Sequence, residues 1–382
     1  MDKKDDNMKK QSLYVSVMLL VALGFGLVRT PAPVVAITKV TPTPDASEMD
    51  IEALLERALA SIEVQAYSDA ISDLNAVIEM DNQLWDAYVY RGFAHAESGD
   101  TDRAIDDYTR AISIRPYDWT TYSLRGDLYI QSGDLAQANL DYDQSLYLNP
   151  RYVPAYAGKA LLTLQRGNET IALIYQGILE ALGAGNDQTT ELLTSTIEMV
   201  DTETVPPVLG YVYYNRSNAH ISDSNWDDAL NDINAAIALQ PEMQDYYMAR
   251  GFIYSETDEL ALAAPDFYQR MTLVELSTIE GTIDFGQTVP VEMDYGVVAR
   301  LTFTASEGQA VTLTARDSLG VGVDPLLVLL DPEGNPIAGN DDGGGEFDSL
   351  LDDYVMPADG TYTALVSHAN GGFVGTVTVS LK

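Results

Sequence analysis

The chain has 382 residues, of which 46% are hydrophobic, so it is long enough for two or three domains with buried cores. Its 58 acidic and 21 basic residues give a formal net charge of −37, which disfavours nucleic acid as a partner and favours cations or basic proteins. Cysteine is absent from the sequence, which excludes disulfides, thiolate metal ligands, a cysteine nucleophile and a lipid anchor on cysteine.

Residues 1–29 are typical of a signal peptide or a single membrane anchor. Lysines at positions 3, 4, 9 and 10 precede an apolar run over residues 13–28. This run is long for the core of a signal peptide and short for a complete membrane span, so its cleavage stays open. The alternative is a buried or disordered N-terminal helix, although no neighbouring pattern offers it a partner. We expect an extracytoplasmic protein that is either secreted or, if the segment is not cleaved, anchored with the lysines of that segment in the cytoplasm.

Residues 30–49 predict an extended linker. The sequence TPAPVVAITKVTPTPDAS, from Thr30 to Ser47, is too rich in proline and threonine to form a packed element. Such a linker would hold the following domains clear of a membrane or cell wall.

From residue 50 the pattern changes to helices of about a dozen residues, separated by turns at a fixed interval. The turns Gly99-Asp100, Gly133-Asp134 and Gly167-Asn168 follow one another at 34 residues. Glycine suits the left-handed residue that ends a helix, and the polar residue after it can cap the next helix. A period of this length predicts a solenoid of helix pairs.

Six repeats fit this register and begin at Ile51, Trp85, Trp119, Val153, Gly210 and Gln244. Small residues at positions 8 and 20 let the two helices approach closely, bulky residues at positions 4 and 24 fill the remaining space, and proline at position 32 ends the second helix. Position 8 holds Ala58, Gly92, Gly126, Ala160, Ser217 and Gly251, and position 20 holds Ala70, Ala104, Ala138, Ala172, Ala229 and Ala263.

This pattern resembles the tetratricopeptide repeat (TPR), and RGFAHAESGDTDRAIDDYTRAISIRP is its closest match. The resemblance implies a non-enzymatic α-helical solenoid, with repeats 1–4 over 50–186 and repeats 5–6 over 210–276. Residues 187–209 break the period, and we expect them to add a helix and a loop. The last repeat carries Pro265 within its second helix, as an atypical terminal repeat does.

In a TPR solenoid, positions 2, 5, 9, 12 and 13 of the first helix line the inner surface. This implies a groove for a protein or peptide partner, with apolar anchors and an acidic rim, suited to a basic or apolar segment. The lysine-rich clamp that some TPR proteins use for acidic C-termini is missing. The alternative is that these side chains pack against the insertion or the C-terminal domain. The groove residues are Leu55, Leu59, Phe93, Asp127, Leu161, Asn218 and Phe252.

Position 7 is basic in every repeat. One interpretation is a cationic ladder that binds an anion. The favoured interpretation is that each stem packs between helices while its head pairs with an acid such as Asp106, Asp107 or Asp141. The position-7 residues are Arg57, Arg91, Arg125, Lys159, Arg216 and Arg250.

Residues 277–382 predict a small all-β sandwich, because segments such as VARLTFTA and GTVTVSL alternate at period two between Gly- and Asp-rich turns. The stretch DPLLVLLDPEGNPIAGNDDGGGEFDSLLDDYVMPADGTYTALV resembles the bacterial pre-peptidase C-terminal (PPC) domain. The fold class is therefore α + β multidomain, a TPR solenoid followed by a jelly-roll-like β-sandwich.

Acidic side chains gather in the turns of this β-domain and suggest a calcium site, since calcium takes six to eight oxygen ligands. The spacing is not that of an EF-hand, and solvated turn residues with local hydrogen bonds are the alternative. No other cofactor is expected. The candidate ligands are Asp324, Asp331, Asn340, Asp341, Asp342, Asp348 and Asp352.

Catalysis has little support in the sequence. Nucleophile-elbow, zinc-protease and phosphate-loop motifs are missing, and the histidines are His95, His220 and His368. We therefore expect an exported or membrane-tethered TPR scaffold with an accessory β-domain. One alternative is an adhesion module in which the β-domain binds a polysaccharide matrix and the repeats are a spacer. The other is an unrecognised hydrolase, which would need a pocket around His368.

Overall fold

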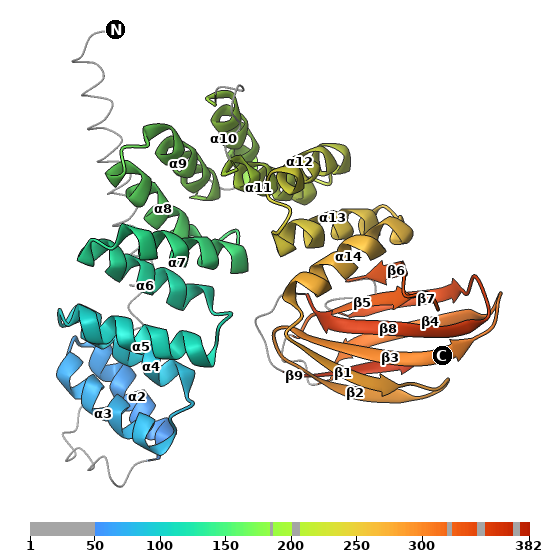
Figure 1. The fold of residues 1–382 in the computed structure, drawn as a ribbon, viewed down its shortest axis with the longest axis horizontal. Helices are drawn as coiled ribbons and strands as arrows, with labels where there is room; N and C mark the ends of the chain where they lie inside the picture. The colour runs from blue at the N-terminus through green and yellow to red at the C-terminus, as the bar shows by residue number, and fades with distance from the viewer. Residues whose placement is uncertain (1–49, 184–185, 201–206, 319–322, 342–347, 370–374) are drawn as a thin grey trace. The chain divides into compact units, whose positions relative to one another are not determined.

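The computed structural model describes residues 50–183, 186–200, 207–318, 323–341, 348–369 and 375–382. The chain divides into two compact parts, residues up to Val200 and residues from Asp201 onward. Thirteen helices precede nine strands in these ranges (Figure 1), which confirms the predicted α + β multidomain fold of a helical solenoid followed by a β-sandwich. The predicted signal or anchor and the linker lie outside the described residues. Every described helix falls short of the length and hydropathy that a membrane span requires.

The first compact part consists of helix pairs with one additional helix. Four pairs begin at the predicted repeat starts, and the additional helix α10 lies in the stretch where the 34-residue period is broken. The helices are α2 (Ile51–Glu63), α3 (Tyr67–Met80), α4 (Trp85–Glu97), α5 (Thr101–Ile114), α6 (Trp119–Ser132), α7 (Leu135–Leu148), α8 (Val153–Gln165), α9 (Glu169–Gly183) and α10 (Asn186–Glu198).

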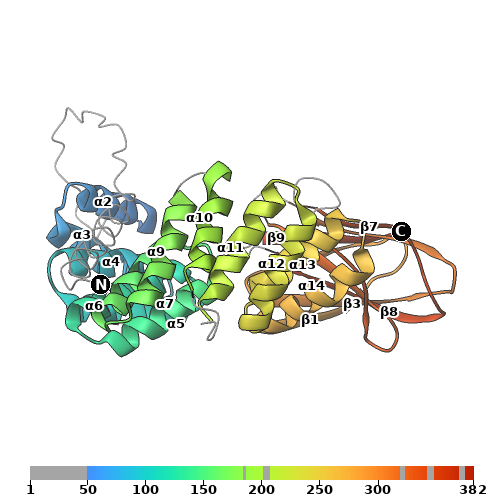
Figure 2. The same ribbon diagram turned by 90° about the horizontal axis from the view of Figure 1, so that it is seen from above.

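The second compact part begins with two more helix pairs, whose first helices start within one residue of the predicted positions. The last helix continues through Pro265, as predicted. Figure 2 shows these helices following one another along the chain. They are α11 (Leu209–Ser222), α12 (Trp226–Leu239), α13 (Gln244–Glu256) and α14 (Leu260–Val274).

In repeats 2, 3 and 6, the two helices of the pair meet at a contact between positions 8 and 24. A Cβ placed on Gly92 would lie 2.8 Å from the ring of Tyr108, and one on Gly126 would lie 3.0 Å from that of Tyr142. Where position 24 is not aromatic, position 8 carries a side chain, as in the pair of Ala58 and Leu74. The six alanines at position 20 are all fully buried. The two helices therefore pack at a distance set by residue size.

Position 15, which joins the two helices of a pair, adopts left-handed backbone in all six repeats. Glycine occupies it in repeats 2 to 4, with φ between 75° and 87°. Repeats 1, 5 and 6 place Gln65, Ser224 and Asp258 there, with φ of 61°, 55° and 60°. A side chain in this conformation costs roughly 1–2 kcal/mol, so three of the six turns are held by packing of the helices on either side.

The sandwich consists of a five-stranded sheet in the order β1-β3-β8-β5-β6 and a four-stranded sheet in the order β2-β9-β4-β7. Only β1 and β3 pair in parallel among the described strands. The strands are β1 (Ser277–Thr282), β2 (Thr288–Met293), β3 (Val297–Ala305), β4 (Ala310–Asp317), β5 (Pro325–Leu330), β6 (Pro336–Asn340), β7 (Ser349–Val355), β8 (Gly360–His368) and β9 (Gly375–Leu381).

Helix α14 covers the outer face of the five-stranded sheet (Figures 1 and 2). Its Phe267 and Met271 share a core with Leu326 and Val328 of β5 and Leu365 of β8. Strand β5 is buried at all six positions, since its alternate residues face the second sheet and the helix. The secondary structure changes near residue 276, yet the core continues across that point.

A buried arginine also connects the last repeat to the sandwich. Arg270 of α14 is 3% exposed, and its guanidinium donates hydrogen bonds to the carbonyl oxygens of His368 and Ala369 at the end of β8. A buried cation that satisfies two carbonyls is costly to detach. Repeat 6 and the sandwich therefore form one packed body.

Candidate functional site

The position-7 side chains form a ladder of ion pairs along the repeats. In five repeats the arginine donates through Nε and Nη2 to the two carboxylate oxygens of an aspartate 16 residues later, at position 23, over distances of 2.6–2.9 Å. These pairs are Arg57–Asp73, Arg91–Asp107, Arg125–Asp141, Arg216–Asp232 and Arg250–Asp266.

Three of these arginines also reach back to the preceding repeat. Arg91 donates to the side chain of Asn75 at 2.7 Å, and Arg250 donates to that of Asn234 at 2.7 Å. Arg125 makes the equivalent bond to Thr109 at 2.9 Å. Each of these guanidinium groups therefore connects three helices, which stabilises the stacking of one repeat on the next.

Repeat 4 reverses this arrangement. Its position-7 residue is Lys159, whose ammonium donates to Asp143 and Asn139 of the preceding repeat. Position 23 of repeat 4 is Tyr175, and the ammonium lies 5.8 Å from the centre of that ring. Lysine carries a point charge rather than a planar fork, so it suits a position where no carboxylate follows in the same repeat.

The prediction that the position-7 cations pair with acids is confirmed. The partners are the position-23 aspartates and Asp143, and Asp106 is not among them. The bidentate hydrogen bonds raise the pKa of Arg216 and Arg250, because they stabilise the charged guanidinium. A cationic ladder for external anions is not supported, since the charges are already matched by carboxylates.

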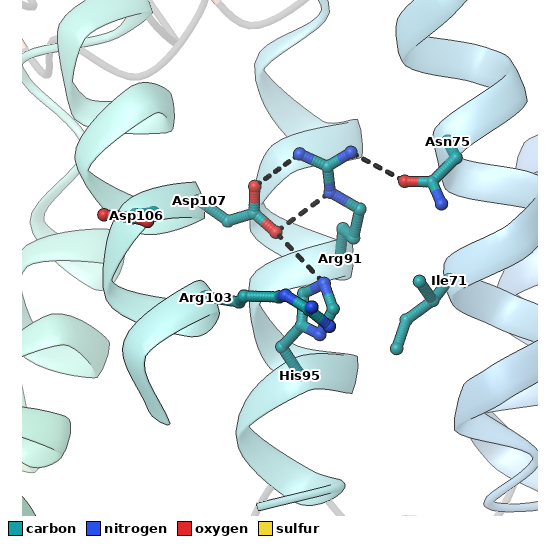
Figure 3. A pocket seen from close by; sticks show the side chains of 7 residues that line it. All are labelled: Ile71, Asn75, Arg91, His95, Arg103, Asp106 and Asp107. Carbon is teal, nitrogen blue, oxygen red and sulfur yellow. Dashed lines mark hydrogen bonds and ion pairs between the residues drawn. The ribbon is translucent and has the colours of Figure 1, made fainter. Parts of the chain in front are cut away.

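A cleft of about 350 Å³ lies beside this ladder, between α3, α4 and α5 (Figure 3). Figure 3 shows Arg91 between Asp107 and Asn75, with His95 below it. His95 Nε2 lies 3.9 Å from Asp107, and burial lowers the pKa of His95 despite the opposing effect of that carboxylate. Arg103 at the mouth is 70% exposed and pairs with Asp100.

The residues that line the cleft are suited to packing between helices and not to catalysis. The residues that line it are Ile71, Asn75, Arg91, His95, Arg103, Asp106 and Asp107, which include no serine, threonine or tyrosine nucleophile. The same histidine–aspartate contact recurs in repeat 5, where His220 Nε2 lies 3.8 Å from Asp232. Because this contact recurs at the same position of two repeats, we interpret it as part of the repeat packing and not as a catalytic pair.

The structure places the predicted groove residues on one face of the first helices. Leu55 occupies position 5 of α2, and the other six occupy position 9 of the first helix in successive repeats. Leu59 is 36% exposed and the remaining six are half-buried. Neighbouring first helices touch, as α2 with α4 and α6 with α8 in the first compact part and α11 with α13 in the second. Side chains at position 9 therefore follow one another within each part.

Asp127 differs from the other position-9 residues because it is the only acid among them, where the other repeats have leucine, phenylalanine or asparagine. Its carboxylate accepts a hydrogen bond of 2.5 Å from the hydroxyl of Tyr142, at position 24 of the same repeat. Burial raises the pKa of Asp127 to about 7, although the bond from Tyr142 opposes this change. Burial and the nearby Asp127 also raise the pKa of Tyr142, so its hydroxyl stays a donor. The first helix of repeat 3 thus carries a carboxyl group that titrates near neutral pH.

The proposed calcium ligands are spread over several turns. Asp331 is a turn residue: its side chain accepts backbone hydrogen bonds from Glu333 and Asn335. Desolvation acts to raise its pKa, but the hydrogen bonds from Asn335, Glu333 and Gly334 lower it overall. Asp348 pairs with Arg316 at 3.4 Å.

The other proposed ligands lie near the ends of β5, β6 and β7. Asp324 and Asp341 are buried, Asn340 accepts a hydrogen bond from the backbone of Leu350, and Asp352 accepts one from Thr312. Asp342 lies outside the described residues. Within those residues, no three histidine, aspartate or glutamate side chains are close enough to share a metal ion.

The hydrolase alternative needs an accessible pocket around His368. That residue is 2% exposed at the end of β8, where Arg270 contacts its carbonyl oxygen, and it does not line the cleft beside the ladder. The surroundings of His368 are therefore those of a residue in the contact between α14 and the sheet.

Comparison with protein families supports the repeat assignment. Models of the tetratricopeptide repeat match residues 85–118, 120–152 and 214–274. These segments coincide with repeats 2, 3, 5 and 6 of the register derived above. The helical region of the chain therefore contains tetratricopeptide repeats.

Two relatives share shorter stretches. The chain is 36% identical over 119 residues to a probable subtilase-type serine protease from Deinococcus radiodurans, covering 31% of this chain and 14% of that protein. It is 51% identical over 47 residues to a DnaJ protein P58IPK homolog from Arabidopsis thaliana, covering 12% of this chain and 10% of that protein. The chain thus spans a small fraction of both relatives.

Solved structures of repeat proteins are similar to parts of the chain. A crystal structure of MamA is 23% identical, with a TM-score of 0.34, over 35% of this chain and 78% of that one. A tetratricopeptide repeat protein from Parabacteroides merdae is 20% identical, with a TM-score of 0.31, over 58% of this chain and 93% of that one.

Proposed function

We propose that this protein is a non-enzymatic scaffold that binds a protein or peptide through the first helices of its tetratricopeptide repeats. The observation that carries the proposal is the row of position-9 side chains, which are large in four of six repeats and remain half-buried or exposed in all of them. The position-20 alanines, by contrast, are fully buried and serve only packing. Side chains left accessible at one position of successive repeats are suited to a partner.

The partner that fits this face is apolar or basic. The chain carries a formal net charge of −37, and position 13 of three first helices is glutamate, at Glu63, Glu97 and Glu256. The position-7 cations form ion pairs with carboxylates, so they do not neutralise the acidic charge that a ligand would meet. Electrostatic attraction would therefore speed the approach of a basic segment and slow that of an acidic one.

We further propose that the scaffold acts outside the cytoplasm. Support comes from the lysines and apolar run within residues 1–29 and the Pro/Thr-rich linker over 30–49. A fusion of residues 1–49 to a reporter enzyme that is active only after export would test this. Activity of that fusion, and its loss when the apolar run is interrupted by two aspartates, is the expected result.

The β-sandwich is proposed to be an accessory domain related to the PPC domain. Support comes from the strand-turn motifs of residues 324–365, and the 119-residue stretch shared with a probable subtilase-type serine protease is compatible with it. Its function here would be to support the last repeat, since α14 packs on its outer face. This role does not require the catalytic activity of the protease.

The test of the binding function uses the full chain immobilised on a support. Extract from the cell envelope is passed over it at low salt, where acidic attraction is strongest, and the retained proteins are identified. A protein retained by the wild type and released by Leu59→Ala/Phe93→Ala would support the proposal. Retention of polysaccharide instead would favour the adhesion alternative, and retention of neither would contradict the scaffold function.

A further inference from the structure

A pocket of about 270 Å³ lies between the last repeat and the sandwich, within the second compact part of the chain. One wall is formed by Phe252 and Glu256 of α13 with Asp258 and Leu260, which follow it. The opposite wall is formed by Leu350 and Asp352 of β7, next to Asn340 at the end of β6. The packing of α14 on the sheet holds these two walls together.

This pocket joins two sets of residues that the sequence had assigned to different sites. Phe252 and Glu256 occupy positions 9 and 13, the partner-facing positions of the first helix, while Asn340 and Asp352 were candidate calcium ligands. Repeat 6 is the last repeat, so its partner-facing side has no further helix pair beyond it. The sandwich supplies the missing wall.

The chemistry of the walls selects a cation with an apolar stem. Phe252, Leu260 and Leu350 provide apolar surface, and three carboxylates lie around it without a basic residue among the lining side chains. The described acids do not approach one another closely enough for a metal ion. An organic cation, whose charge is spread over a larger group, matches carboxylates held on separate walls.

Two further features favour a guanidinium. The hydroxyl oxygen of Ser255, which also lines the pocket, is buried and has no hydrogen-bond partner among the described residues, so it is available as an acceptor. Phe252 also lines the pocket, and an aromatic ring can stack with a planar cation. The volume is below the roughly 300–1,000 Å³ of pockets that enclose a whole small molecule, and a single side chain suits it better.

We propose that this pocket receives an arginine side chain presented by the protein partner. The proposal rests on the proposed peptide-binding function and specifies one contact within it. The arginine stem lies against Phe252, Leu260 and Leu350, and its head is shared by Glu256, Asp258 and Asp352. The last repeat and the sandwich thus form a joint recognition surface, which explains why the two are fused.

The test uses the full chain with ¹³C-labelled leucine methyl groups and N-acetyl-arginine N-methylamide as the probe. We expect saturable shifts of the Leu260 and Leu350 methyl resonances. N-acetyl-citrulline N-methylamide has nearly the same shape without the charge, and we expect it to leave these resonances in place. Equal shifts with both probes, or none with arginine, would overturn the proposal.

Variants locate the effect. Glu256→Gln/Asp352→Asn should weaken binding of the arginine probe by roughly tenfold, the effect of losing charge-assisted hydrogen bonds. Glu79→Gln is the control, because it also removes one exposed carboxylate, on α3, and Glu79 does not line this pocket. An equal loss in the control would contradict a site in the pocket.

The outcome is separable from that of the binding function. If envelope protein is retained by the full chain and the arginine probe shifts neither leucine, the scaffold function stands and the pocket proposal fails. If the probe binds and no protein is retained, the pocket stands and the scaffold function fails.

Discussion

Arg125 and Asp141 lie 16 residues apart in the sequence and form a two-pronged ion pair, with Nε and Nη2 of the arginine 2.9 and 2.8 Å from the two carboxylate oxygens. Arg125 also donates to Thr109 of the preceding repeat at 2.9 Å. One side chain therefore links α5, α6 and α7. Because this arrangement recurs along the repeats, it contributes both to the closure of each helix pair and to the order of the stack.

Removing one member of this pair should destabilise the chain. Arg125→Ala leaves Asp141, which is nearly buried, without its cation, and we expect a loss of about 3 kcal/mol in the free energy of unfolding. Urea denaturation followed by circular dichroism measures it. The double variant Arg125→Ala/Asp141→Ala should recover part of the loss, because no unpaired charge remains.

Arg103 provides the matched control for this prediction. It also pairs with an aspartate, Asp100 at 3.1 Å, but its side chain is 70% exposed. Exposed ion pairs contribute about 0–1 kcal/mol, so Arg103→Ala should lower the free energy of unfolding by less than about 1 kcal/mol. A loss at Arg103 as large as that at Arg125 would contradict the ladder as the source of stability.

The contact between positions 8 and 24 predicts that a usually favourable substitution is harmful here. Gly→Ala inside a helix normally stabilises by about 1 kcal/mol. At Gly92 the new methyl group would lie 2.8 Å from the ring of Tyr108, so Gly92→Ala should instead destabilise, by about 1–3 kcal/mol, in thermal unfolding.

A second substitution tests the cause. Repeat 1 combines Ala58 with Leu74 at the same two positions, so Gly92→Ala/Tyr108→Leu reproduces a pair that the chain already uses. We expect the double variant to lose less free energy of unfolding than the two single variants lose together. Strict additivity would show that the two positions do not constrain each other.

The titration of Asp127 predicts a pH dependence of stability. An aspartate in the unfolded chain titrates near about 3.9, and in the folded protein its pKa is raised to about 7. The folded state then binds more protons between these values, so the contribution of Asp127 is fully present below about pH 4 and is lost as the pH rises through 7. Asp127→Asn should therefore gain stability relative to the wild type from pH 4 to pH 8.

Urea unfolding at several pH values measures this difference. Glu79→Gln, which removes an exposed acid from α3, is the control and should follow the wild-type curve. If the stability of Asp127→Asn also follows the wild-type curve over this pH range, the pKa of Asp127 is not raised in the folded protein, which would contradict its burial.

The core shared by α14 and the sheet predicts how fragments behave. A fragment of residues 277–382 lacks α14, which exposes Leu326, Val328 and Leu365, each worth about 1.5–3 kcal/mol of burial. We expect it to aggregate or to melt at a lower temperature than a fragment of residues 207–382. Calorimetry with size-exclusion chromatography compares them, and equal melting of two monomeric fragments would contradict the shared core.

The repeats were predictable because their information is local and recurs. Alanine recurs at position 20 in all six repeats and glycine at position 15 in three of them, and this recurrence in one register distinguishes the pattern from chance. The pairing of position 7 with acids was predictable from composition. The 16-residue spacing between each cation and its partner could also have been predicted, because aspartate recurs at position 23 in five repeats.

The contact between the last repeat and the sandwich could not be predicted in the same way. It depends on Arg270 and Phe267 meeting residues about 100 positions later, such as His368 and Leu365. Each of these residues occurs once, so no repetition signals the contact. The sequence offered one hint, the unbroken apolar run PLLVLL of β5. A strand that is apolar on both faces needs a cover on each side.

The central claim is tested most directly by measuring how tightly the partner retained in the binding experiment binds two single leucine variants. Leu59 of α2, at position 9, is 36% exposed, and Leu140 of α7, on a second helix, is 59% exposed. Calorimetric titration of the retained partner should show Leu59→Ala binding about tenfold more weakly than wild type, with Leu140→Ala unchanged. Equal affinities of both variants and the wild type would contradict binding through the first helices.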